Sequence, residues 1–328
     1  MRYTNLKIGS ATIRTSVLGF GCSAILGRSG TRDSMHALAT AWDHGINVFD
    51  TARSYGYGDS ESLLGKFLRG RRSEAIISTK FGILPARQQP WKQALKPIAR
   101  HLLTVVPSMR RAIRGQVQAQ FQPGMFSVDV LQQSIEESLR KLGTDYVDIL
   151  FMHDAPASVL TQDELLAAID GLIRSGKIRA AGISARPDVI RTALTRMPRM
   201  LSAAQFPCNL LDLSIADDIG KSHSSALFFS NHPFGGVEGV AKTRLALEQI
   251  KNWKDTPELI RDKLENTTDS LLADVVLNVI TQEKSIDVVL TAMMRPSHIV
   301  TNAEAIASSI FTEEELAWLR ANIAAPQA

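Results

Sequence analysis

The chain has 328 residues, of which 45% are hydrophobic and 21% charged, and its formal net charge is +4 at pH 7. This composition is typical of a globular protein and excludes wholesale disorder, and the length suits one large α/β domain or two average ones. The charge balance is too mild to indicate nucleic-acid binding. The sequence shows neither a membrane span nor an apolar signal sequence at its start. With only Cys22 and Cys208 present, we expect a reducing, cytoplasmic location and no disulfide framework.

Short apolar runs and helical patterns alternate along the whole sequence. A small hairpin is expected over residues 5–16. The pattern then predicts strands over residues 17–21, 48–49, 75–80, 146–152, 178–183, 201–204, 226–229 and 286–290. Helices are predicted over residues 33–44, 63–68, 128–142, 165–173, 238–252 and 256–282, and from residues 187 and 312 onward.

Several helix boundaries carry recognisable residues. Gly143 follows a predicted helix, where a glycine readily takes the left-handed conformation that ends a helix. Thr161 with Glu164, and Thr312 with Glu315, have the spacing of a capping box. These pairs predict helix starts ahead of the apolar residues that follow them.

The alternation of strands and helices predicts the fold class. Strands separated by helices pair in parallel through right-handed crossovers. Eight such units in a chain of this size predict an α/β fold, a single (β/α)8 TIM barrel domain over residues 1–328. A doubly wound sheet is the competing architecture, but no G-x-G-x-x-G run follows the first predicted strand, which weakens it.

One connection is far longer than the others. More than forty residues follow the third barrel strand, at Lys80, where two to six are usual. No acidic residue occurs between Glu74 and Asp129. We expect residues 83–127 to be a basic inserted loop, either a lid that attracts an acidic or phosphorylated substrate, or a partner surface, or a solvated decoration. Its basic residues include Arg87, Lys92, Lys96, Arg100, Arg110, Arg111 and Arg114.

Polar side chains stand at the carboxyl-terminal ends of six predicted strands. In a barrel these ends converge on the face where active sites are built. Taken singly, each such residue is more often a strand terminator, a structural histidine or a surface charge than a catalyst. Together they predict one site. The residues are Asp50, Lys80, His153, Ser184, Gln205 and Ser230.

Four of the polar residues form a set suited to proton transfer. Tyr55 follows Asp50 by five residues, and its phenol, with a reference pKa of about 10, is a poor proton donor near neutrality unless it is tuned. The ammonium of Lys80 favours the phenolate, and Asp50 holds that ammonium in place. His153 can orient a carbonyl or relay a proton. The sequence has no metal-ligand spacing and no nucleophile motif, so hydride transfer from a cofactor to a carbonyl is the natural companion of this proton transfer.

The sequence resembles the aldo-keto reductases, NAD(P)H-dependent enzymes on a (β/α)8 barrel. The resemblance runs over almost the whole chain. The run at residues 19–23, Gly-Phe-Gly-Cys-Ser, is most similar to the sugar-dehydrogenase-like members. The matching stretches are Leu-Gly-Phe-Gly at 18–21, Gly-Ile-Asn-Val-Phe-Asp-Thr-Ala-Arg-Ser-Tyr-Gly at 45–56, Ser-Thr-Lys-Phe-Gly at 78–82, Ser-Ile-Glu-Glu-Ser-Leu-Arg-Lys-Leu-Gly at 134–143, and Asp-Tyr-Val-Asp at 145–148 continuing to His153.

The resemblance implies a catalytic tetrad and a cofactor site. The tetrad is Asp50, Tyr55, Lys80 and His153, with Tyr55 as the general acid. The nicotinamide carboxamide is expected against Ser184 and Gln205, and the adenosine 2′-phosphate and adenine against the segment from Arg295 to Asn302. The full set of expected cofactor-binding residues is Gly21, Cys22, Asp50, Ser184, Gln205, Ser230, Arg295, His298 and Asn302.

The resemblance favours NADP(H) over NAD(H) as the cofactor. The guanidinium of Arg295 can fork onto phosphate oxygens, although an exposed arginine at a helix start is an equally ordinary explanation. Three positions depart from the family pattern. Ala185 stands where an asparagine is usual, Asn231 where many members carry an aromatic residue that stacks on the nicotinamide, and Ala-Met-Met at 292–294 where a glycine and a polar residue are usual.

These expectations combine into one leading hypothesis and two alternatives. The leading hypothesis is a reversible NADP(H)-dependent reductase of an aldehyde, ketone or sugar. Its substrate is expected to be a small molecule, and an acidic one if the basic insertion is a lid. We expect no nucleic-acid or membrane partner, no metal, and a monomeric or weakly oligomeric state. The first alternative is a cofactor-binding regulatory or scaffold protein without catalysis. The second is a barrel isomerase or lyase, for which the sequence carries no phosphate or metal signature.

Overall fold

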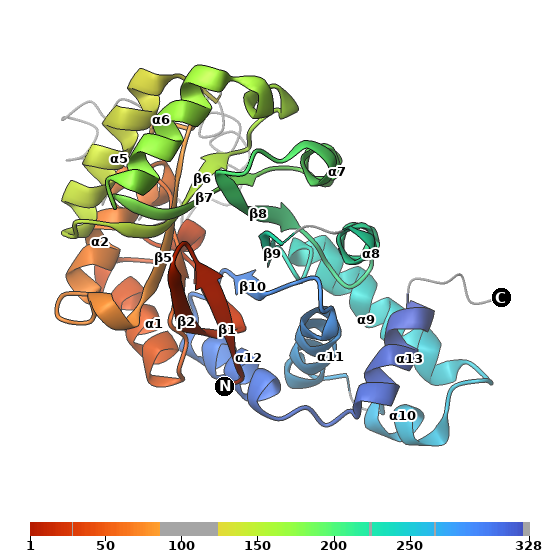
Figure 1. Cartoon of the computed structure of the whole chain (residues 1–328). Coiled ribbons are helices and arrows are strands. Elements are labelled where there is room, and N and C mark those ends of the chain that lie inside the picture. The colour runs from red at the N-terminus through yellow and green to blue at the C-terminus, as the bar shows by residue number, and fades with distance from the viewer. Residues whose placement is uncertain (28, 86–123, 223–224, 266, 324–328) are drawn as a thin grey trace, which may run out of the picture.

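A closed barrel of eight parallel strands forms the centre of the molecule (Figure 1). The computed structural model describes residues 1–27, 29–85, 124–222, 225–265 and 267–323. Around the barrel the strands follow the order β10-β3-β4-β5-β6-β7-β8-β9, which confirms the predicted (β/α)8 fold. The strands are β3 (Leu18–Gly21), β4 (Val48–Asp50), β5 (Ile76–Phe81), β6 (Val147–His153), β7 (Ile178–Ser184), β8 (Leu201–Pro207), β9 (Leu227–Asn231) and β10 (Val288–Thr291).

Helices connect the strands and cover the outside of the barrel (Figure 1). Gly143 ends α5 in a left-handed conformation, with φ 65°, as expected. Pro187 is the first residue of α7, where its missing N–H costs nothing. The helices are α1 (Thr31–Asp43), α2 (Ser60–Phe67), α5 (Val128–Leu142), α6 (Asp163–Arg174), α7 (Pro187–Arg196), α8 (Ser214–Lys221), α9 (Gly236–Asn252), α10 (Glu258–Lys263), α11 (Asp269–Gln282), α12 (Pro296–Ala307) and α13 (Glu313–Ile323).

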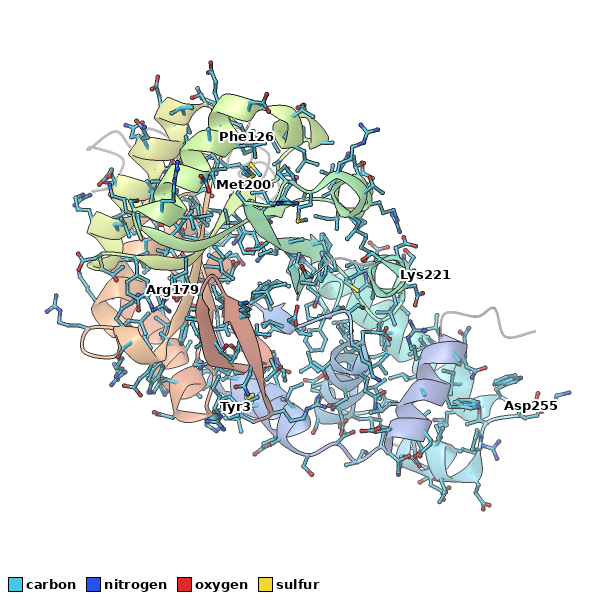
Figure 2. The ribbon with its side chains drawn as sticks, in the orientation of Figure 1. Tyr3, Phe126, Arg179, Met200, Lys221 and Asp255 are labelled. Carbon is cyan, nitrogen blue, oxygen red and sulfur yellow. The ribbon has the colours of Figure 1, made fainter. Side chains whose placement is uncertain are left out.

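The predicted N-terminal hairpin covers the amino-terminal end of the barrel. Its strands β1 (Tyr3–Ile8) and β2 (Ala11–Ser16) pair in antiparallel register. Leu6 and Ile8 pack into the barrel interior, and the turn lies beside Arg179 at the start of β7 (Figures 1 and 2). Gly9 is required in that turn, because its φ is +61° and a Cβ there would lie 2.5 Å from the carbonyl oxygen of Arg179. The opposite, carboxyl-terminal end of the barrel is left for the polar strand ends.

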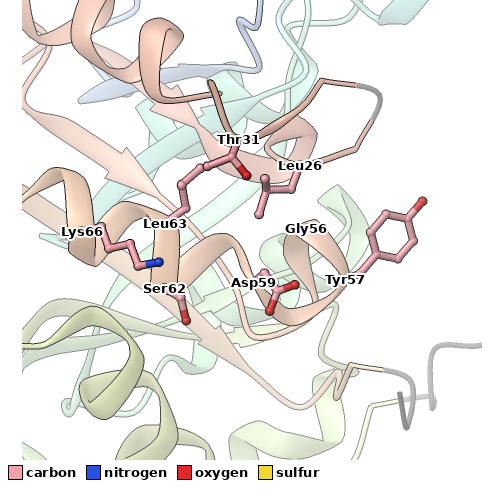
Figure 3. Close-up of a pocket in the computed structure, with 8 residues that line it drawn as sticks. All are labelled: Leu26, Thr31, Gly56, Tyr57, Asp59, Ser62, Leu63 and Lys66. Carbon is pink, nitrogen blue, oxygen red and sulfur yellow. The ribbon is translucent and has the colours of Figure 1, made fainter. Parts of the chain in front are cut away.

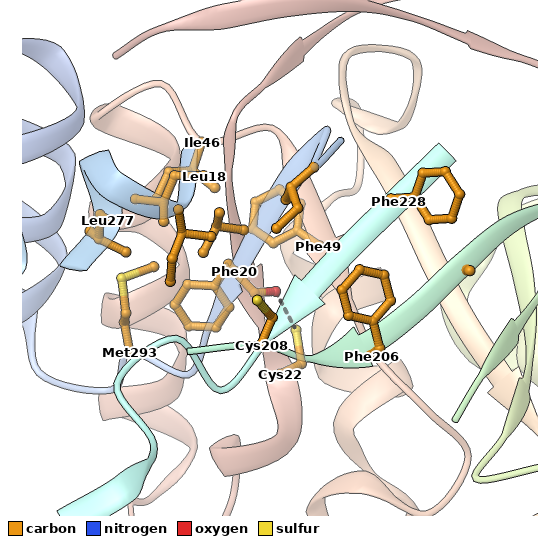
Figure 4. Packing of buried hydrophobic residues seen from close by; sticks show 14 of the residues in the cluster. Leu18, Phe20, Cys22, Ile46, Phe49, Phe206, Cys208, Phe228, Leu277 and Met293 are labelled. Atoms are coloured by element: carbon orange, nitrogen blue, oxygen red, sulfur yellow. Dashed lines mark hydrogen bonds between the residues drawn. The ribbon is translucent and has the colours of Figure 1, made fainter. Parts of the chain in front are cut away.

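Two apolar cores result from the alternation of side chains along each strand. The inner core fills the barrel with residues such as Val48, Ile149 and Phe229. The outer core lies between strands and helices, and Figure 4 shows part of it, including Phe20 and Phe49. This alternation means that a strand can direct polar residues to both sides, which becomes important on β5.

A buried ion cluster fastens the amino-terminal end of β6. The carboxylate of Asp148 has no exposed surface, and it accepts hydrogen bonds from Arg72 at 2.8 Å, from Arg179 at 2.6 Å and from the backbone N–H of Ile77 at 2.9 Å. Both guanidinium groups also lie over the ring of Tyr146, at 4.0 and 4.3 Å from its centroid. The cluster joins β5, β6 and β7 far from the polar strand ends.

The two ends of the predicted insertion are held together beside the barrel. The backbone N–H of Met125 donates to the carbonyl oxygen of Gly82 at 2.8 Å. The ring of Phe126 lies edge-on to that of Phe81, with centroids 5.9 Å apart. A Cβ on Gly82 would lie only 2.4 Å from the ring of Phe126. Most of the basic segment expected at 83–127 falls within residues 86–123, which lie outside the described residues.

Two sequence-based expectations about helices were wrong. Residues 256–282 form two helices, α10 and α11, because the side chain of Thr268 accepts a hydrogen bond from the N–H of Leu271 and starts a new helix. Thr161 does not cap α6, since it ends a 3₁₀ turn and its hydroxyl donates to the carbonyl of Ser158. The second capping box is confirmed, because Thr312 and Glu315 exchange both of its hydrogen bonds at the start of α13.

The ion cluster at Asp148 predicts a large stability effect for a single substitution. Asp148→Asn should lower the free energy of unfolding by about 3 kcal/mol, because it leaves two partly buried guanidinium groups without their carboxylate. Urea denaturation measures this change. Asp170→Asn is the matched control, because Asp170 pairs with Arg174 on the solvent-exposed side of α6 and should change stability very little. Equal urea midpoints for the two variants would contradict the stabilising role of the ion cluster at Asp148.

Candidate active site

The polar strand ends meet at the carboxyl-terminal end of the barrel. Register alone aligns several of them, because Asp50 pairs with Ser78, His153 with Ser184, and Ser184 with Gln205 on neighbouring strands. The six positions predicted from the sequence therefore do lie around one end of one barrel.

An ion pair between Asp50 and Lys80 occupies the centre of this end. The ammonium of Lys80 lies 2.5 Å from Oδ2 of Asp50 and donates a second hydrogen bond, of 3.0 Å, to the carbonyl oxygen of Thr51. Lys80 is 1% exposed and Asp50 is 5% exposed. Because both side chains are withdrawn from water, the attraction between the two charges offsets part of their desolvation cost.

The second carboxylate oxygen of Asp50 is held from two other strands. Its Oδ1 accepts a hydrogen bond from the hydroxyl of Ser78 at 2.7 Å and from the amide nitrogen of Gln205 at 2.9 Å. The amide oxygen of Gln205 in turn accepts from the hydroxyl of Ser184 at 2.8 Å. This chain of hydrogen bonds runs from β7 through β8 to β4 and orients the carboxylate toward Lys80.

Ser78 was missed by the sequence reasoning, although a signal was present. It stands two residues before Lys80 on β5, so it points to the same, inner side of the barrel. A polar residue at an inward position next to a predicted catalytic lysine is the pattern that would have found it.

Tyr55 lies on a turn just beyond β4, next to Lys80 and His153. The Lys80 ammonium is 4.9 Å from the centroid of the tyrosine ring, and the ring of His153 meets it edge-on at 5.7 Å. Burial raises the pKa of the Tyr55 hydroxyl, whereas the charge and the hydrogen bond of Lys80 lower it. Lys80 lowers the pKa of Tyr55, as the sequence predicted, but burial raises it more. The phenol therefore keeps its proton at neutral pH.

His153 is uncharged at neutral pH. Burial and the nearby positive charge of Lys80 lower the pKa of its imidazole to about 3. Its Nδ1 atom is buried and has no hydrogen-bond partner. A neutral imidazole can accept or donate a hydrogen bond. Of the two roles expected for His153, this state favours orienting a carbonyl group over relaying a proton through a charged imidazolium.

The predicted nicotinamide side of the site contains polar atoms that lack a partner within the protein. The hydroxyl of Ser230, the amide oxygen of Asn231 and the hydroxyl of Thr291 are buried at the ends of β9 and β10 without a hydrogen bond. Unsatisfied buried polar atoms carry a free-energy cost that a ligand with complementary groups removes. Of the three, Asn231 shares the inward side of β9 with Phe229, so its amide oxygen is the one directed toward a ligand at the barrel end.

Gly21 and Cys22 lie at the end of β3, which pairs with β10. A Cβ on Gly21 would lie 3.4 Å from the carbonyl oxygen of Thr291. Cys22 is fully buried, and its thiol contacts the carbonyl oxygen of Phe20 at 3.9 Å (Figure 4). The side chain of Cys22 is thus directed into the outer core, and a role for Cys22 in cofactor binding stays a prediction.

The predicted adenosine-phosphate segment begins α12. Arg295 immediately precedes the helix and is exposed, as is His298, whereas Asn302 is buried in the second turn. Helix N-termini favour negative charge, so an exposed arginine at this position adds to an environment suited to a phosphate. The unusual segment at 292–294 has a structural use, because Met293 is 2% exposed and belongs to the outer core.

A separate hollow lies beside the turn that carries Tyr55 (Figure 3). Its volume is about 340 Å³, and the ring of Tyr57 extends away from α2 at its edge. Gly56 is required in this loop, because its φ is +58° and a Cβ there would lie 2.9 Å from the carbonyl oxygen of Ile25. The lining residues are Leu26, Thr31, Gly56, Tyr57, Asp59, Ser62, Leu63 and Lys66.

Two further features bear on metals and membranes. Among the described residues, no group of three or more His, Cys, Asp and Glu side chains is placed to hold a metal ion. Within the described ranges, no helix combines the length and the apolar character needed to cross a membrane.

Comparison with known proteins decides the family. The sequence model of the aldo/keto reductase family matches residues 17–220, more than half of the chain. The chain belongs to the aldo/keto reductase family. L-galactose dehydrogenase of Arabidopsis thaliana is 30% identical over 200 residues, which cover 58% of this chain and 51% of the plant protein. D-threo-aldose 1-dehydrogenase of a Pseudomonas species is 32% identical over 207 residues, covering 61% of this chain and 58% of the relative.

The matched regions span little more than half the length of these relatives, so substrates do not transfer with the family. Among solved structures, the holo form of the aldo-keto reductase AKR11C1 from Bacillus halodurans superposes with a TM-score of 0.68, covering 100% of this chain and 98% of that one. At 22% sequence identity, this likeness concerns the fold alone. The fold and the family predicted from the sequence are both confirmed.

The low pKa of His153 predicts a pH dependence of stability. The unfolded chain binds a proton at His153 near pH 6.5 and the folded chain only near pH 3, so stability falls as the pH drops below 6.5. This residue alone should contribute a slope of about 1.4 kcal/mol per pH unit. Urea unfolding between about pH 4.5 and pH 7.5 should give a flatter profile for His153→Gln than for the wild type. The exposed His36, changed to Gln, is the control. Parallel profiles for wild type and His153→Gln would contradict the uncharged state of His153 in the folded chain.

Proposed function

We propose that this aldo/keto reductase family member is an NADP(H)-dependent oxidoreductase that reduces the carbonyl group of an aldehyde, ketone or sugar, and that it also catalyses the reverse oxidation. The observation that carries the proposal is the juxtaposition of a protonated phenol, a buried ammonium–carboxylate pair and an uncharged imidazole at one barrel end. Sugars are the favoured substrate class, since two relatives bear the names L-galactose dehydrogenase and D-threo-aldose 1-dehydrogenase.

In the mechanism, Tyr55 supplies the proton. When bound, the reduced nicotinamide supplies a hydride to the carbonyl carbon. The hydroxyl of Tyr55 donates its proton to the carbonyl oxygen, and the ammonium of Lys80 stabilises the resulting phenolate. Asp50 keeps Lys80 charged and in place. The uncharged His153 hydrogen-bonds the carbonyl oxygen and orients it toward Tyr55.

Residues suited to hold the cofactor lie at the ends of β7, β8 and β9 and at the start of α12. Ser184, Gln205, Ser230 and Asn231 would hold the nicotinamide carboxamide, with the buried unpartnered atoms of Ser230 and Asn231 available for it. Arg295, at the start of α12, would hold the 2′-phosphate that distinguishes NADP(H) from NAD(H).

The proposal predicts a selective loss of turnover in Tyr55→Phe. Removal of the proton donor should lower kcat for reduction of a panel of aldehydes and sugars by about 100-fold or more, while the Kd for NADPH stays unchanged. Tyr57→Phe is the control, because Tyr57 lies two residues further along the same loop and is exposed. NADPH binding is followed by quenching of protein fluorescence.

The possible results separate the two candidate functions. Absence of binding to either nicotinamide cofactor would overturn the reductase. Binding without turnover across the panel would favour the regulatory, non-catalytic alternative, for which the departures at Ala185 and Asn231 are the supporting features.

A second prediction concerns the choice of cofactor. Arg295→Ala should weaken NADPH binding by about tenfold or more, because a charge-assisted hydrogen bond to the phosphate is lost, and leave NADH binding unchanged. Calorimetric titration with both cofactors measures the difference. Arg174→Ala, at the C-terminal end of α6, serves as the control. An equal loss for NADPH and NADH would contradict the assignment of Arg295 to the phosphate.

A further inference from the structure

Ser78 is a fully buried residue of β5 that contacts the ion pair of Asp50 and Lys80. It has no exposed surface, and it points to the inner side of the barrel, as Lys80 does two residues later. In the parallel register it lies opposite Asp50 on β4. Its hydroxyl donates to Oδ1 of Asp50 at 2.7 Å, so Ser78 holds the carboxylate oxygen that does not face the ammonium.

The two carboxylate oxygens of Asp50 have different partners. Oδ2 faces the ammonium of Lys80 at 2.5 Å. Oδ1 accepts hydrogen bonds from the hydroxyl of Ser78 and from the amide nitrogen of Gln205, the latter at 2.9 Å. The terminal torsion of an aspartate has a broad energy well, so a contact at one oxygen alone would leave the plane of the carboxylate poorly fixed. The two donors at Oδ1 therefore determine the direction in which Oδ2 faces.

The two donors to Oδ1 of Asp50 are not equivalent. The amide oxygen of Gln205 also accepts from Ser184 at 2.8 Å, and both of these residues are expected to contact the nicotinamide carboxamide. A ligand that hydrogen-bonds to the Gln205 amide can change its orientation, and with it the bond to Asp50. Among the described residues, the hydroxyl of Ser78 has Asp50 as its only partner. The bond from Ser78 is therefore the one that does not depend on the cofactor.

The position of the Asp50 carboxylate determines the position of the Lys80 ammonium. Of the three N–H donors of this ammonium, one bonds to Asp50 and a second bonds to the carbonyl oxygen of Thr51 at 3.0 Å. The N–H of Thr51 donates in turn to the carbonyl oxygen of Ser78 at 2.8 Å. The third N–H is left for the phenol of Tyr55, whose ring centroid lies 4.9 Å from the ammonium nitrogen.

We infer that Ser78 is a positioning residue, whose hydroxyl fixes the Asp50 carboxylate and thereby the Lys80 ammonium for proton transfer from Tyr55. Ser78 acts through Asp50 and not on the substrate. The consequence for turnover rests on the proposed reductase activity, whereas the consequence for the position of Lys80 does not.

A second buried carboxylate, on α11, provides a matched control. Asp274 is 5% exposed, as Asp50 is. Its Oδ1 also accepts from a serine hydroxyl, that of Ser309 at 2.5 Å, and from a side-chain amide nitrogen, that of Asn278 at 2.8 Å. Its Oδ2 accepts from the backbone N–H of Ile310 at 2.9 Å and not from an ammonium. Removal of the Ser309 hydroxyl thus deletes the same kind of hydrogen bond away from the proposed site.

The first experiment compares Ser78→Ala with Ser309→Ala. Ser78→Ala should lower kcat for the carbonyl panel by about tenfold or more, because a displaced ammonium stabilises the phenolate less well, and should leave the Kd for NADPH unchanged. Ser309→Ala should lower Tm and leave kcat unchanged. Ser78→Cys keeps a weak donor in a similar volume, so it should retain a larger part of kcat than Ser78→Ala does.

The second experiment needs no turnover. In the cofactor-free protein labelled with ¹³C at lysine Cε, the Lys80 resonance is identified by its absence in Lys80→Met. In Ser78→Ala this resonance should move by more than its line width, because the surroundings of the ammonium change, and in Ser309→Ala it should stay in place. Ser78→Cys serves if Ser78→Ala does not fold, and a smaller movement in the same direction is expected.

The outcomes distinguish this inference from the proposed function. If the Lys80 resonance moves in Ser78→Ala but the wild type has no turnover, the reductase is overturned and the positioning of Lys80 by Ser78 is retained. If the wild type turns over and Ser78→Ala keeps the wild-type kcat, the positioning role is overturned and the reductase is retained. An equal loss of kcat in Ser309→Ala would trace the effect to general stability and would also overturn the positioning role.

Discussion

The buried contact between Lys80 and Asp50 is the constraint on which the rest of the site depends. Neither charge is stable alone at 1% and 5% exposure, because transfer of a single ion from water costs several kcal/mol. The pair is stabilised because both carboxylate oxygens of Asp50 accept hydrogen bonds, Oδ1 from Ser78 and Gln205 and Oδ2 from Lys80. Through these hydrogen bonds the ion pair connects β4, β5 and β8. It also fixes the position of the Lys80 ammonium beside the Tyr55 ring.

The same burial sets the protonation of the other two groups. Tyr55 retains its proton and His153 does not gain one, because in both cases burial disfavours the charged form. A phenol that is protonated at neutral pH is ready to act as an acid, and the ammonium of Lys80 stabilises the phenolate only once it forms. In the proposed mechanism, this arrangement stabilises the charge that develops during proton transfer more than the charge present at rest.

Much of this architecture could be predicted from the sequence because it depends on periodicity. Strand ends are marked where an apolar run meets a polar residue, and the barrel then brings Asp50, Lys80 and His153 together without further information. The pattern could not predict which of two similar local signals would form in the folded structure. Thr161 and Thr312 begin capping boxes of the same spacing. Thr161 instead ends a 3₁₀ turn, and only the box at Thr312 forms. Partnerships such as Ser184 with Gln205 depend on register between strands, which a single sequence does not encode locally.

Strand β5 directs polar residues to both sides of the barrel wall. Its consecutive residues Thr79 and Lys80 point to opposite sides, Lys80 into the barrel toward Asp50 and Thr79 outward to Glu61. The loop after β4 is therefore held from within, where Lys80 donates to the carbonyl of Thr51, and outside the barrel Thr79 holds the carboxylate of Glu61 at the start of α2. The placement of Tyr55 on this loop matters for the proposed mechanism, because a displacement of about 1 Å is enough to cost roughly 100-fold in rate. The two contacts of β5 restrain the residues that precede and follow Tyr55, at Thr51 and at Glu61.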